Sequence, residues 1–521
     1  MENMDIDSID KEWDLVVIGG GITGAGVLRE AVRCGLRTLL LEQNDFAWGT
    51  SSRSSKLVHG GLRYLKQGRF LLTRTAVKER EALLREAPGL VESLKFCVPV
   101  FSGQRPGKWA LETGLTMYDL IAGKKQHHYD DKAAFAGAIP GIRTDGLTGG
   151  FSFFDARSDD TRLVMRLIND AVAHGGWALN YTRAARIHRD HRGRLTGVRA
   201  QDTETGRERS LTARAVINAT GAWVEALHAP PEKGYHVRPL RGSHLVFPAD
   251  KLPIPCGISY MHPEDNRAVF IVPWEGVVLA GTTDLDHTES LDNEPKISPA
   301  EAHYLMQGIH ALFPELSISL QDCRASFAGV RPVLSRGNRP PSSESREHLI
   351  WTNNGLVSVT GGKLTTFRKL AWDALLAARP FLPDFSTGSR PPAFEKIPVP
   401  ETGPDSLITP DTLRRLYGRY GMAARQITEN AGAGDLDRIP GTRSVWAELP
   451  YVAAHESVRH LEDILLRRVR LGLLLDGGGL PAMDRIQRLL TPALDWDANR
   501  WSLEIESYRE LWQRCYAPPG E

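Results

Sequence analysis

Three glycines near the start of the chain have the spacing needed to hold a phosphate group. Gly19, Gly21 and Gly24 form the pattern G-x-G-x-x-G. The first glycine of such a pattern allows a tight turn, the second lets the backbone approach a pyrophosphate, and the third lets a helix pack close to a strand. The free N–H groups and the dipole at the start of that helix favour negative charge. The spacing therefore predicts a phosphate site.

A carboxylate follows the glycines at the distance typical of a dinucleotide site. Glu42 comes about 20 residues after them, where an acid accepts hydrogen bonds from ribose hydroxyls. The elements that must position these residues are also visible: the apolar run 15–18 predicts a buried parallel strand, 25–34 a helix and 38–41 a second strand. An ordinary glycine-rich turn would leave Glu42 unexplained, so we predict a dinucleotide-binding β-α-β unit.

The composition limits the class of protein. A chain of 521 residues allows roughly two to four domains. Its 64 Lys and Arg balance 63 Asp and Glu, which argues against nucleic acid as the main partner. The five cysteines form no C-x-x-C pair, so we expect no metal site and a reducing compartment. The acidic N-terminus is not a signal peptide and no apolar stretch approaches a membrane span, so we expect a soluble or peripheral protein.

Polar residues gather where predicted strands end. Residues 45–61, DFAWGTSSRSSKLVHGG, are dense in hydroxyls and glycine and offer backbone and side-chain donors. Residues 179–217 alternate apolar and polar positions, which predicts a meander of hairpins. Residues 215–223 and 349–368 each predict a strand that runs into a glycine turn.

The rest of the chain predicts a lobe, a linker and a helical region. Residues 98–142 mix strand-like and helical pieces, as an inserted lobe would. Within them, 105–125 is apolar with basic ends, which fits either an anionic membrane surface or a lobe helix with solvated ends. The proline-rich residues 386–404 predict a linker, and 409–516 a mostly helical region. The arginines of 458–475 are interpreted as snorkelling from a core helix.

Eight motifs are distributed between residue 14 and residue 371. They are VVIGGGITGAG, TSSRSSKLVHGGLRYL, DDTRLV, NATGAWV, RGSHLV, PWEG followed by GTTD, GVRP and GGKLTTFRKLA. In this order the chain resembles the FAD-dependent glycerol-3-phosphate dehydrogenases, the quinone-linked respiratory type related to D-amino-acid-oxidase-like flavoproteins. The stretch SSKLVHGGLRYL is specific to that family among flavoproteins, and HLEDILLRRVRLGL resembles its extra C-terminal domain.

The resemblance implies FAD, held non-covalently. Its pyrophosphate would lie on the glycine turn, its adenosine ribose on Glu42, and the helix after the GGKLTT turn would point at the pyrimidine end of the flavin. A helix dipole there stabilises negative charge on reduced flavin. The expected cofactor-binding residues are Gly19, Gly21, Ile22, Thr23, Gly24, Glu42, Thr50, Ser51, Ser52, Ser55, Lys56, His59, Gly60, Thr220, Gly221, Gly362, Lys363, Leu364 and Thr365.

The resemblance also implies a reaction: oxidation of sn-glycerol 3-phosphate to dihydroxyacetone phosphate, with hydride passing from C2 to flavin N5 and electrons leaving to membrane quinone. Arg63 and Arg331 are candidates to hold the phosphate, because guanidinium matches phosphate oxygens bidentately. The expected substrate-binding set is Arg63, Tyr64, Arg331 and Lys363. His59 and His244 are both candidate bases, since histidine titrates near working pH. The expected catalytic set is His59, His244, Arg331 and Lys363.

The predicted fold class is α/β, with an FAD-binding Rossmann-like domain, an inserted antiparallel-sheet substrate (cap) lobe and a C-terminal helical domain. The predicted segments are 1–85, 151–230 and 325–385 for FAD binding, 86–150 and 231–324 for the cap lobe, 386–404 for the linker and 405–521 for the helical domain. We expect a homo-oligomer, peripheral on the inner face of the cytoplasmic membrane.

Four alternatives remain open at this stage. A glycerol-3-phosphate oxidase that uses oxygen, or a dehydrogenase for another polyol phosphate, would keep every flavin motif. A flavin-dependent RNA-modifying protein would need a basic surface and salt-sensitive binding, against the near-zero net charge. A catalytically inactive flavin-binding module would not need the arginines and Lys363.

Overall fold

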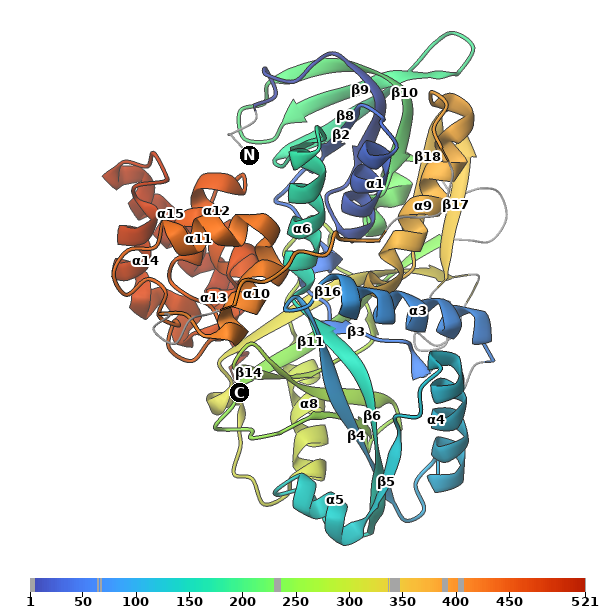
Figure 1. Ribbon diagram of the computed structural model, residues 1–521, viewed down its shortest axis with the longest axis vertical. Helices are drawn as coiled ribbons and strands as arrows, with labels where there is room; N and C mark the ends of the chain where they lie inside the picture. Colours follow the sequence, from blue (N-terminus) through green and yellow to red (C-terminus); the bar gives the residue numbers. More distant parts are fainter. Residues whose placement is uncertain are drawn as a thin grey trace.

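Two sheets and a helical domain make up the protein. The computed structural model describes residues 5–62, 65, 68–228, 236–335, 337, 347–386, 392–401 and 407–520. In Figure 1 one sheet with its helices forms the upper half, the second sheet forms the lower half, and the C-terminal helices, orange to red, lie at the side of both. The predicted fold class is confirmed.

The upper sheet has a parallel centre. Its strands, in the order β17-β18-β10-β1-β2-β7, are β17 (His348–Asn353), β18 (Leu356–Gly361), β10 (Glu208–Asn218), β1 (Glu12–Ile18), β2 (Thr38–Leu41) and β7 (Trp177–Leu179). All neighbours from β18 to β7 pair in parallel, while β17 is antiparallel at the edge. β8 (Thr182–Arg189) and β9 (Leu195–Asp202) extend from β10 as the predicted hairpin meander.

Alternate residues of β1 face two different layers. Leu15 and Val17 pack in one core with α1 (Ile22–Arg33), α6 (Asp160–Ala173) and α9 (Phe367–Ala378). Val16 and Ile18 pack in another core with the meander of β8, β9 and β10. Because both faces are covered, the strand is apolar and buried at every position from Leu15 to Ile18, as buried parallel strands are. This confirms the β-α-β unit predicted from the glycine pattern.

The lower sheet is mostly antiparallel. Within the described residues it has ten strands: β3 (Leu57–Val58), β4 (Val91–Phe101), β5 (His128–Asp131), β6 (Leu147–Ser158), β11 (His236–Pro248), β12 (Gly257–Met261), β13 (Ala268–Trp274), β14 (Val277–Gly281), β15 (Leu285–Asp286) and β16 (Ala325–Ser335). β4 and β12 pair in parallel. The helices of this half are α3 (Phe70–Glu86), α4 (Lys108–Ala122), α5 (Lys132–Ala138) and α8 (Pro299–Leu312).

Two strands of the lower sheet contain residues that were predicted to belong to the FAD-binding segments. β6 pairs with β4 as far as Ser158, beyond residue 150. β16 pairs with β11 from Val246↔Ala325 to His236↔Ser335, although its residues are predicted for FAD binding. Strand partners are set by contacts far along the chain, which local patterns do not reveal. Both strands carry motif residues toward the upper sheet.

The C-terminal region is helical, as predicted. It contains α10 (Pro410–Tyr420), α11 (Ala424–Glu429), α12 (Glu448–His455), a π-helical turn (Asp463–Arg468), α13 (Leu471–Leu474), α14 (Met483–Leu490) and α15 (Ala498–Cys515). Thr409 and Asp497 cap α10 and α15 by accepting a backbone N–H. The interpretation of snorkelling arginines is wrong: Arg467, Arg468 and Arg470 are at most 2% exposed and ion-paired.

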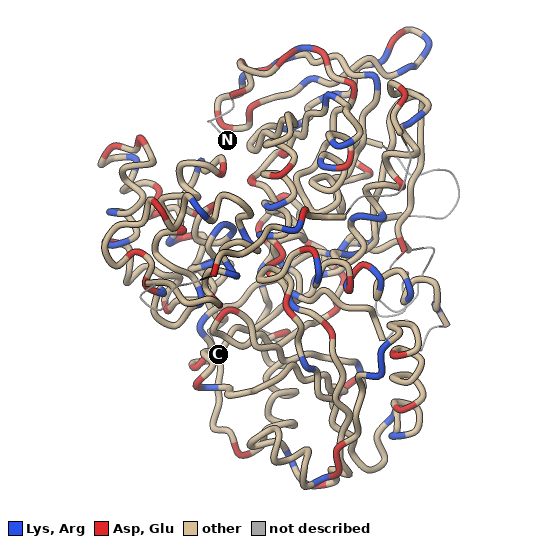
Figure 2. Tube along the Cα trace, in the orientation of Figure 1, with Lys and Arg blue, Asp and Glu red and all other residues tan. Residues whose placement is uncertain are grey.

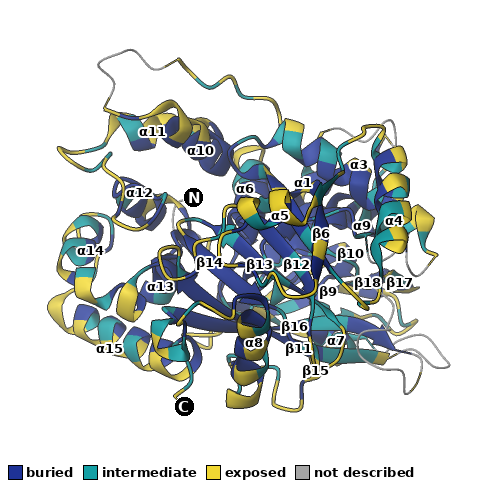
Figure 3. Cartoon of the chain, turned by 90° about the horizontal axis from the view of Figure 1, so that it is seen from below, coloured by how far each residue is buried: buried dark blue, intermediate teal, exposed yellow. Residues whose placement is uncertain are grey.

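Burial and charge follow these layers. Figure 3 shows the strands buried, while the outer faces of α4, α14 and α15 are exposed. Basic and acidic residues are interspersed along the trace in Figure 2. Among the helices within the described ranges, none combines the length and apolarity needed to cross a bilayer.

Candidate active site

The glycine turn joins β1 to α1 at very close range. Gly19 has φ +107°, and a Cβ on Gly24 would lie 1.8 Å from the Gly19 carbonyl oxygen. A Cβ on Gly21 would stand 3.1 Å from the Ser51 hydroxyl, in the space between the start of α1 and the loop opposite. The Ile22 N–H, at the first position of α1 ahead of Thr23, donates to Ser51 Oγ at 2.9 Å. The turn thus leaves room for a phosphate where a side chain would block it.

Glu42 lies beside this turn, at the end of β2. Its carboxylate accepts hydrogen bonds from the N–H of Gly20 (2.6 Å) and of Asn44 (2.9 Å). Burial raises the pKa of Glu42, and these backbone donors lower it in part. A carboxylate has about four lone-pair sites, so two remain for hydroxyl groups. The geometry fits the predicted ribose contact.

The segment 45–60, which we call the hydroxyl loop, connects the two sheets. The Thr50 hydroxyl donates to the Val330 carbonyl on β16. Ser55 Oγ lies 2.9 Å from Nε2 of His244 on β11. Together with the Ser51 contact, these bonds place the loop between the nucleotide turn and the lower sheet.

Lys56 serves the loop itself. Its Nζ donates to both Asp160 oxygens, at 2.8 and 3.0 Å, and to the Ser52 carbonyl at 2.6 Å. Burial, and then the charge of Arg470, lower the pKa of Lys56 to about 7. The ammonium is therefore directed at Asp160, and a cofactor contact through the main chain of Lys56 stays a prediction.

The end of the hydroxyl loop rests on a buried polar cluster. The Gly60 N–H donates to Tyr118 Oη (2.9 Å) and Asp155 Oδ1 (3.1 Å), and a Cβ on Gly60 would lie 2.2 Å from Tyr118 Oη. Arg80 donates to the same two groups, at 2.9 and 2.6 Å. Sequence analysis missed this cluster because its members come from α3, α4 and β6. The acidic residue Asp155, directly after Phe153 and Phe154 in the sequence, was the available signal.

Two further turns lie at the same edge of the upper sheet. Thr220 Oγ1 donates to Asn218 Oδ1 after β10, and Thr360 Oγ1 donates to the Gly221 carbonyl (2.9 Å). Gly362, with φ +73°, follows β18 and is succeeded by Lys363 and a 3-10 turn, Leu364–Thr366, that leads into α9. The His59 N–H donates to Thr365 Oγ1 at 3.2 Å, which brings the hydroxyl loop to this turn.

His244 is a neutral, buried imidazole. The ring is 2% exposed and stacks on Phe327 with centroids 4.6 Å apart. Burial, and then the charges of Arg331 and Lys56, hold its pKa well below the ordinary value. Its Nδ1 has no hydrogen-bond partner among the described residues. Burial and these two cations therefore disfavour the protonated form of the imidazole, so His244 accepts a proton less readily than a free histidine unless a negative charge comes close to it.

Arg331 lies on β16, held by the loop after β14. It donates to Thr282 Oγ1 (2.7 Å), Asp284 Oδ1 (3.0 Å) and the Thr283 carbonyl (3.3 Å). Its side chain is 23% exposed, so it is oriented but open to solvent on one side. The neighbouring Pro332 lies 3.9 Å from the position of a Cβ on Gly221. The predicted cation thus stands at the boundary between the two sheets.

The structure brings most predicted site residues to one place. The glycine turn, Glu42, the turn at Gly221 and the turn at Gly362 follow the carboxyl ends of β1, β2, β10 and β18, where open parallel sheets bind ligands. The hydroxyl loop, His244 and Arg331 face them from the lower sheet. Arg63 and Tyr64 fall outside the described residues.

Fold and site together define a dinucleotide-binding protein, with a nucleotide-binding sheet, a second sheet that offers a cation and a buried histidine, and a C-terminal helical domain. The chain belongs to the family of FAD-dependent oxidoreductases, whose model matches residues 14–368. Residues 394–501 match a second model, described as the C-terminal domain of alpha-glycerophosphate oxidase. Membership of this family confirms FAD as the cofactor.

Curated relatives are similar over much or nearly all of the chain. An aerobic glycerol-3-phosphate dehydrogenase of Staphylococcus aureus (strain USA300) is 30% identical over 525 residues, covering 96% of this chain and 93% of its own. The enzyme of the same name from Bacillus subtilis (strain 168) is 36% identical over 376 residues, covering 71% and 67%.

Solved structures show the same fold. The glycerol-3-phosphate dehydrogenase of Bacillus halodurans, complexed with FAD, has a TM-score of 0.74 at 24% identity and covers 97% of this chain and 95% of its own. An L-α-glycerophosphate oxidase of Mycoplasma pneumoniae with FAD bound has a TM-score of 0.60 at 16% identity, covering 75% and 100%.

Proposed function

We propose that the protein oxidises sn-glycerol 3-phosphate to dihydroxyacetone phosphate with FAD and passes the electrons to a membrane quinone. The observation that carries this proposal is the similarity, over 96% of the chain, to an enzyme named aerobic glycerol-3-phosphate dehydrogenase. It is supported by a site that combines a nucleotide turn, an oriented arginine and a neutral histidine.

The residues that would hold FAD are those at the carboxyl edge of the upper sheet. The turn of Gly19, Gly21 and Gly24 has space for the pyrophosphate, and Glu42 keeps two acceptor sites for the ribose. When bound, FAD supplies the acceptor for the two electrons that leave C2 of the substrate. The protein contributes orientation and charge, as in other cofactor enzymes.

Arg331 would bind the substrate phosphate, with Lys363, Arg63 and Tyr64 as its predicted partners. Since Thr282 and Asp284 fix the guanidinium, little side-chain entropy is lost when a phosphate binds. The phosphate would also offset a positive charge on His244, whose pKa Arg331 lowers. Proton acceptance from the C2 hydroxyl would thus be favoured once substrate is present. His59 remains the second candidate base.

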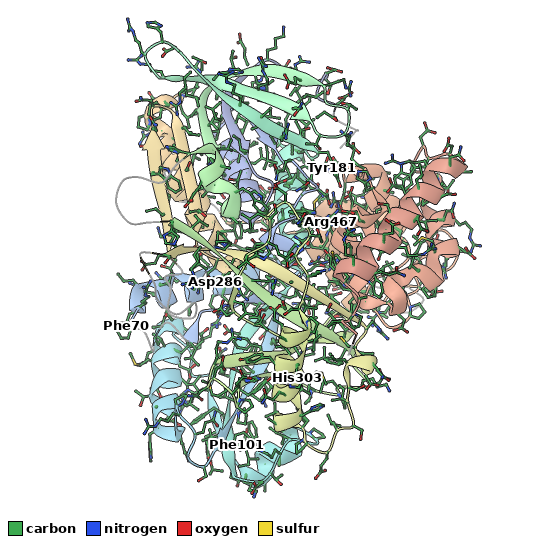
Figure 4. All side chains as sticks on the ribbon, turned by 180° about the vertical axis from the view of Figure 1, so that it is seen from behind. Phe70, Phe101, Tyr181, Asp286, His303 and Arg467 are labelled. Carbon is green, nitrogen blue, oxygen red and sulfur yellow. The ribbon has the colours of Figure 1, made fainter. Side chains whose placement is uncertain are left out.

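The exposed apolar residues support contact with a membrane. Phe70 and Leu71 at the start of α3 are 48% and 79% exposed, and Trp109 and Leu120 on α4 are 80% and 77% exposed. Phe70 lies at the outer edge of the molecule in Figure 4. Basic residues flank these positions, namely Arg69, Arg74, Lys108, Lys124 and Lys125. Apolar side chains with basic neighbours suit an anionic bilayer surface, which here would be the inner face of the cytoplasmic membrane.

An oxidase that uses oxygen is the second candidate. The match of residues 394–501 to the C-terminal domain of alpha-glycerophosphate oxidase favours it. The two candidates share the substrate and differ in the acceptor, so one experiment separates them.

The test is an anaerobic absorbance spectrum of the purified protein before and after addition of sn-glycerol 3-phosphate. We expect the flavin band to bleach and a quinone to restore it faster than dissolved oxygen does. Faster recovery with oxygen would favour the oxidase. A flavin that stays oxidised would exclude this substrate, and light scattering on the same sample tests the predicted homo-oligomer.

A further inference from the structure

The C-terminal domain contacts the hydroxyl loop at three separate points. The first is Asp45, a fully buried residue at the start of the loop. Its carboxylate accepts hydrogen bonds from Arg467 (2.5 Å) and from both terminal nitrogens of Arg468 (2.7 Å each). Figure 4 shows Arg467 beside Tyr181 where the C-terminal helices meet the upper sheet. A bidentate arginine fixes the orientation of its carboxylate as well as its position.

The second point is the carbonyl oxygen of Ser52, in the middle of the loop. Arg470 donates to it at 3.0 Å and also bonds Asp160 on α6 and the Leu466 carbonyl. Lys56, inside the loop, donates to the same carbonyl and the same Asp160. Arg470 has φ +68°, so the chain turns sharply there to present its side chain to the loop. The Ser52 carbonyl oxygen therefore accepts hydrogen bonds from two basic side chains, Lys56 of the loop and Arg470 of the C-terminal domain.

The third point is Arg53. Its guanidinium donates to the Trp48 carbonyl within the loop and ion-pairs with Glu294. Tyr516, just beyond α15, accepts from Arg53 at 3.4 Å and donates to Glu294. The Tyr516 carbonyl accepts the Ser326 N–H of β16 at 2.7 Å. The last described turn of the chain is thus fixed against the loop.

We propose that the C-terminal domain positions the hydroxyl loop, and that Arg470 is the positioning residue. The inference rests on the proposed function, in which the hydroxyl loop contacts FAD. Its role would be to hold the Ser52 main chain, so that Ser51 stays on the Ile22 N–H and Ser55 on His244. Arg470 acts through the loop and does not itself touch substrate or cofactor.

If the C-terminal domain only packed against the rest of the protein, these buried ion pairs would not be needed. Replacing buried ion pairs by well-packed apolar residues is often neutral or stabilising, so adhesion does not require them. Their distinctive property is geometric: guanidinium groups direct several hydrogen bonds at fixed angles. Several of the bonds from Arg467, Arg468 and Arg470 end on one twelve-residue segment, Asp45–Lys56, or on Asp160 beside it. Others stay within the C-terminal domain and hold the guanidinium groups in place.

The test compares two conservative variants of equally buried arginines. Arg470→Lys keeps the charge but cannot bond Ser52, Asp160 and Leu466 together. Arg415→Lys is the matched control, because Arg415 bonds Glu448, Glu275 and Ser444, which all lie outside the hydroxyl loop. Both variants should lower the melting temperature. The readouts are the dissociation constant of FAD from titration of apoprotein, the flavin midpoint potential, and kcat and KM.

We expect Arg470→Lys to weaken FAD binding at least about tenfold, to shift the midpoint potential, and to lower kcat about 10- to 100-fold with little change in KM, because small displacements of a reacting group cost that much. Arg415→Lys should leave these quantities near their original values. Equal effects of both variants, or unchanged FAD binding and kcat in Arg470→Lys, would overturn the proposal.

A milder pair decides the matter if Arg470→Lys does not fold. Tyr516→Phe removes the hydroxyl at Arg53, and Tyr420→Phe removes a buried hydroxyl that bonds Glu448, away from the loop. Weaker FAD binding in the first variant alone supports the proposal, and equal behaviour of the two refutes it. FAD titration and the midpoint potential need no substrate, so their result does not depend on whether the proposed reaction is correct.

Discussion

Substitution of Arg331 by lysine should separate phosphate recognition from stability. Arg331→Ala would remove from Asp284, which is 5% exposed, the guanidinium that lies 3.0 Å from its Oδ1. Breaking a buried pair costs about 3–5 kcal/mol, toward the lower end for an arginine that is partly exposed. Such a loss would mix unfolding with weak binding. Arg331→Lys keeps a positive charge near Asp284 and removes the planar fork.

The size of the effect follows from the bonds that lysine cannot make. The guanidinium uses one terminal nitrogen on Thr282 and the other on Asp284 and the Thr283 carbonyl, which fixes its plane. A lysine ammonium is a point charge and loses bidentate contact with a phosphate. One charged hydrogen bond contributes about 1.5–3 kcal/mol, so KM should rise roughly 10- to 150-fold.

The assay is steady-state oxidation of sn-glycerol 3-phosphate, with FAD content measured on the same sample. Arg267→Lys is the matched control, since Arg267 donates to the Thr282 carbonyl (2.9 Å) and lies 3.9 Å from Asp284. If Arg331 merely shapes this loop, the two variants should behave alike. A KM within twofold of the original for Arg331→Lys, at full FAD content, would refute the assignment of the phosphate site.

Other predictions follow from the same geometry. Gly24→Ala should prevent stable folding, because its Cβ would lie 1.8 Å from a carbonyl oxygen. Gly21→Ala should keep the melting temperature of the apoprotein but weaken FAD binding. Thermal scans and FAD titration distinguish the two outcomes. Ser55→Ala should lower the free energy of unfolding by about 1–3 kcal/mol, measured in urea, because Nε2 of the buried His244 loses its partner. The free energy of unfolding should fall as pH drops from about 4.5 toward 2. Burial alone would raise the pKa of Asp45, but the charges of Arg468 and Arg467 outweigh it and lower that pKa from 3.8 to about 2. The unfolded chain therefore binds more protons than the folded protein in that range. Urea unfolding followed by circular dichroism at several pH values in that range checks the last prediction, and a urea midpoint that does not fall between about pH 4.5 and pH 2 would contradict it.

Local patterns were sufficient for the nucleotide-binding unit. The glycine spacing, the apolar runs and Glu42 lie within 31 residues, from Glu12 to Glu42, and each constrains the backbone directly. At Gly24 any side chain would clash with the backbone, so the position must be glycine and the constraint is visible in the sequence. The hairpin meander was predictable for the same reason, because alternation is a property of neighbouring residues.

Long-range partners could not be predicted in this way. Asp45 pairs with Arg468, 423 residues later, and no local pattern in either segment identifies the other as its partner. Lys56 was predicted to contact the cofactor on the strength of its motif, yet its ammonium is directed at Asp160. Likewise β16 joins the lower sheet through β11, a pairing that depends on tertiary packing. The identity of motif residues was therefore easier to predict than the direction of their side chains.

The buried ion pairs also impose an order on biosynthesis. Asp45, Lys56 and Asp160 are made early, but Arg468 and Arg470 follow much later, Arg470 coming 310 residues after Asp160. At about 5–20 residues per second, roughly 20 to 85 s separate Asp45 from Arg468 on the ribosome. During that interval the Asp45 carboxylate lacks the two arginines that it pairs with in the folded protein, and burying a carboxylate without its partner is costly. The contacts of the C-terminal domain with the hydroxyl loop are consequently completed only after Arg470 has been made, and a chain terminated before that point lacks them.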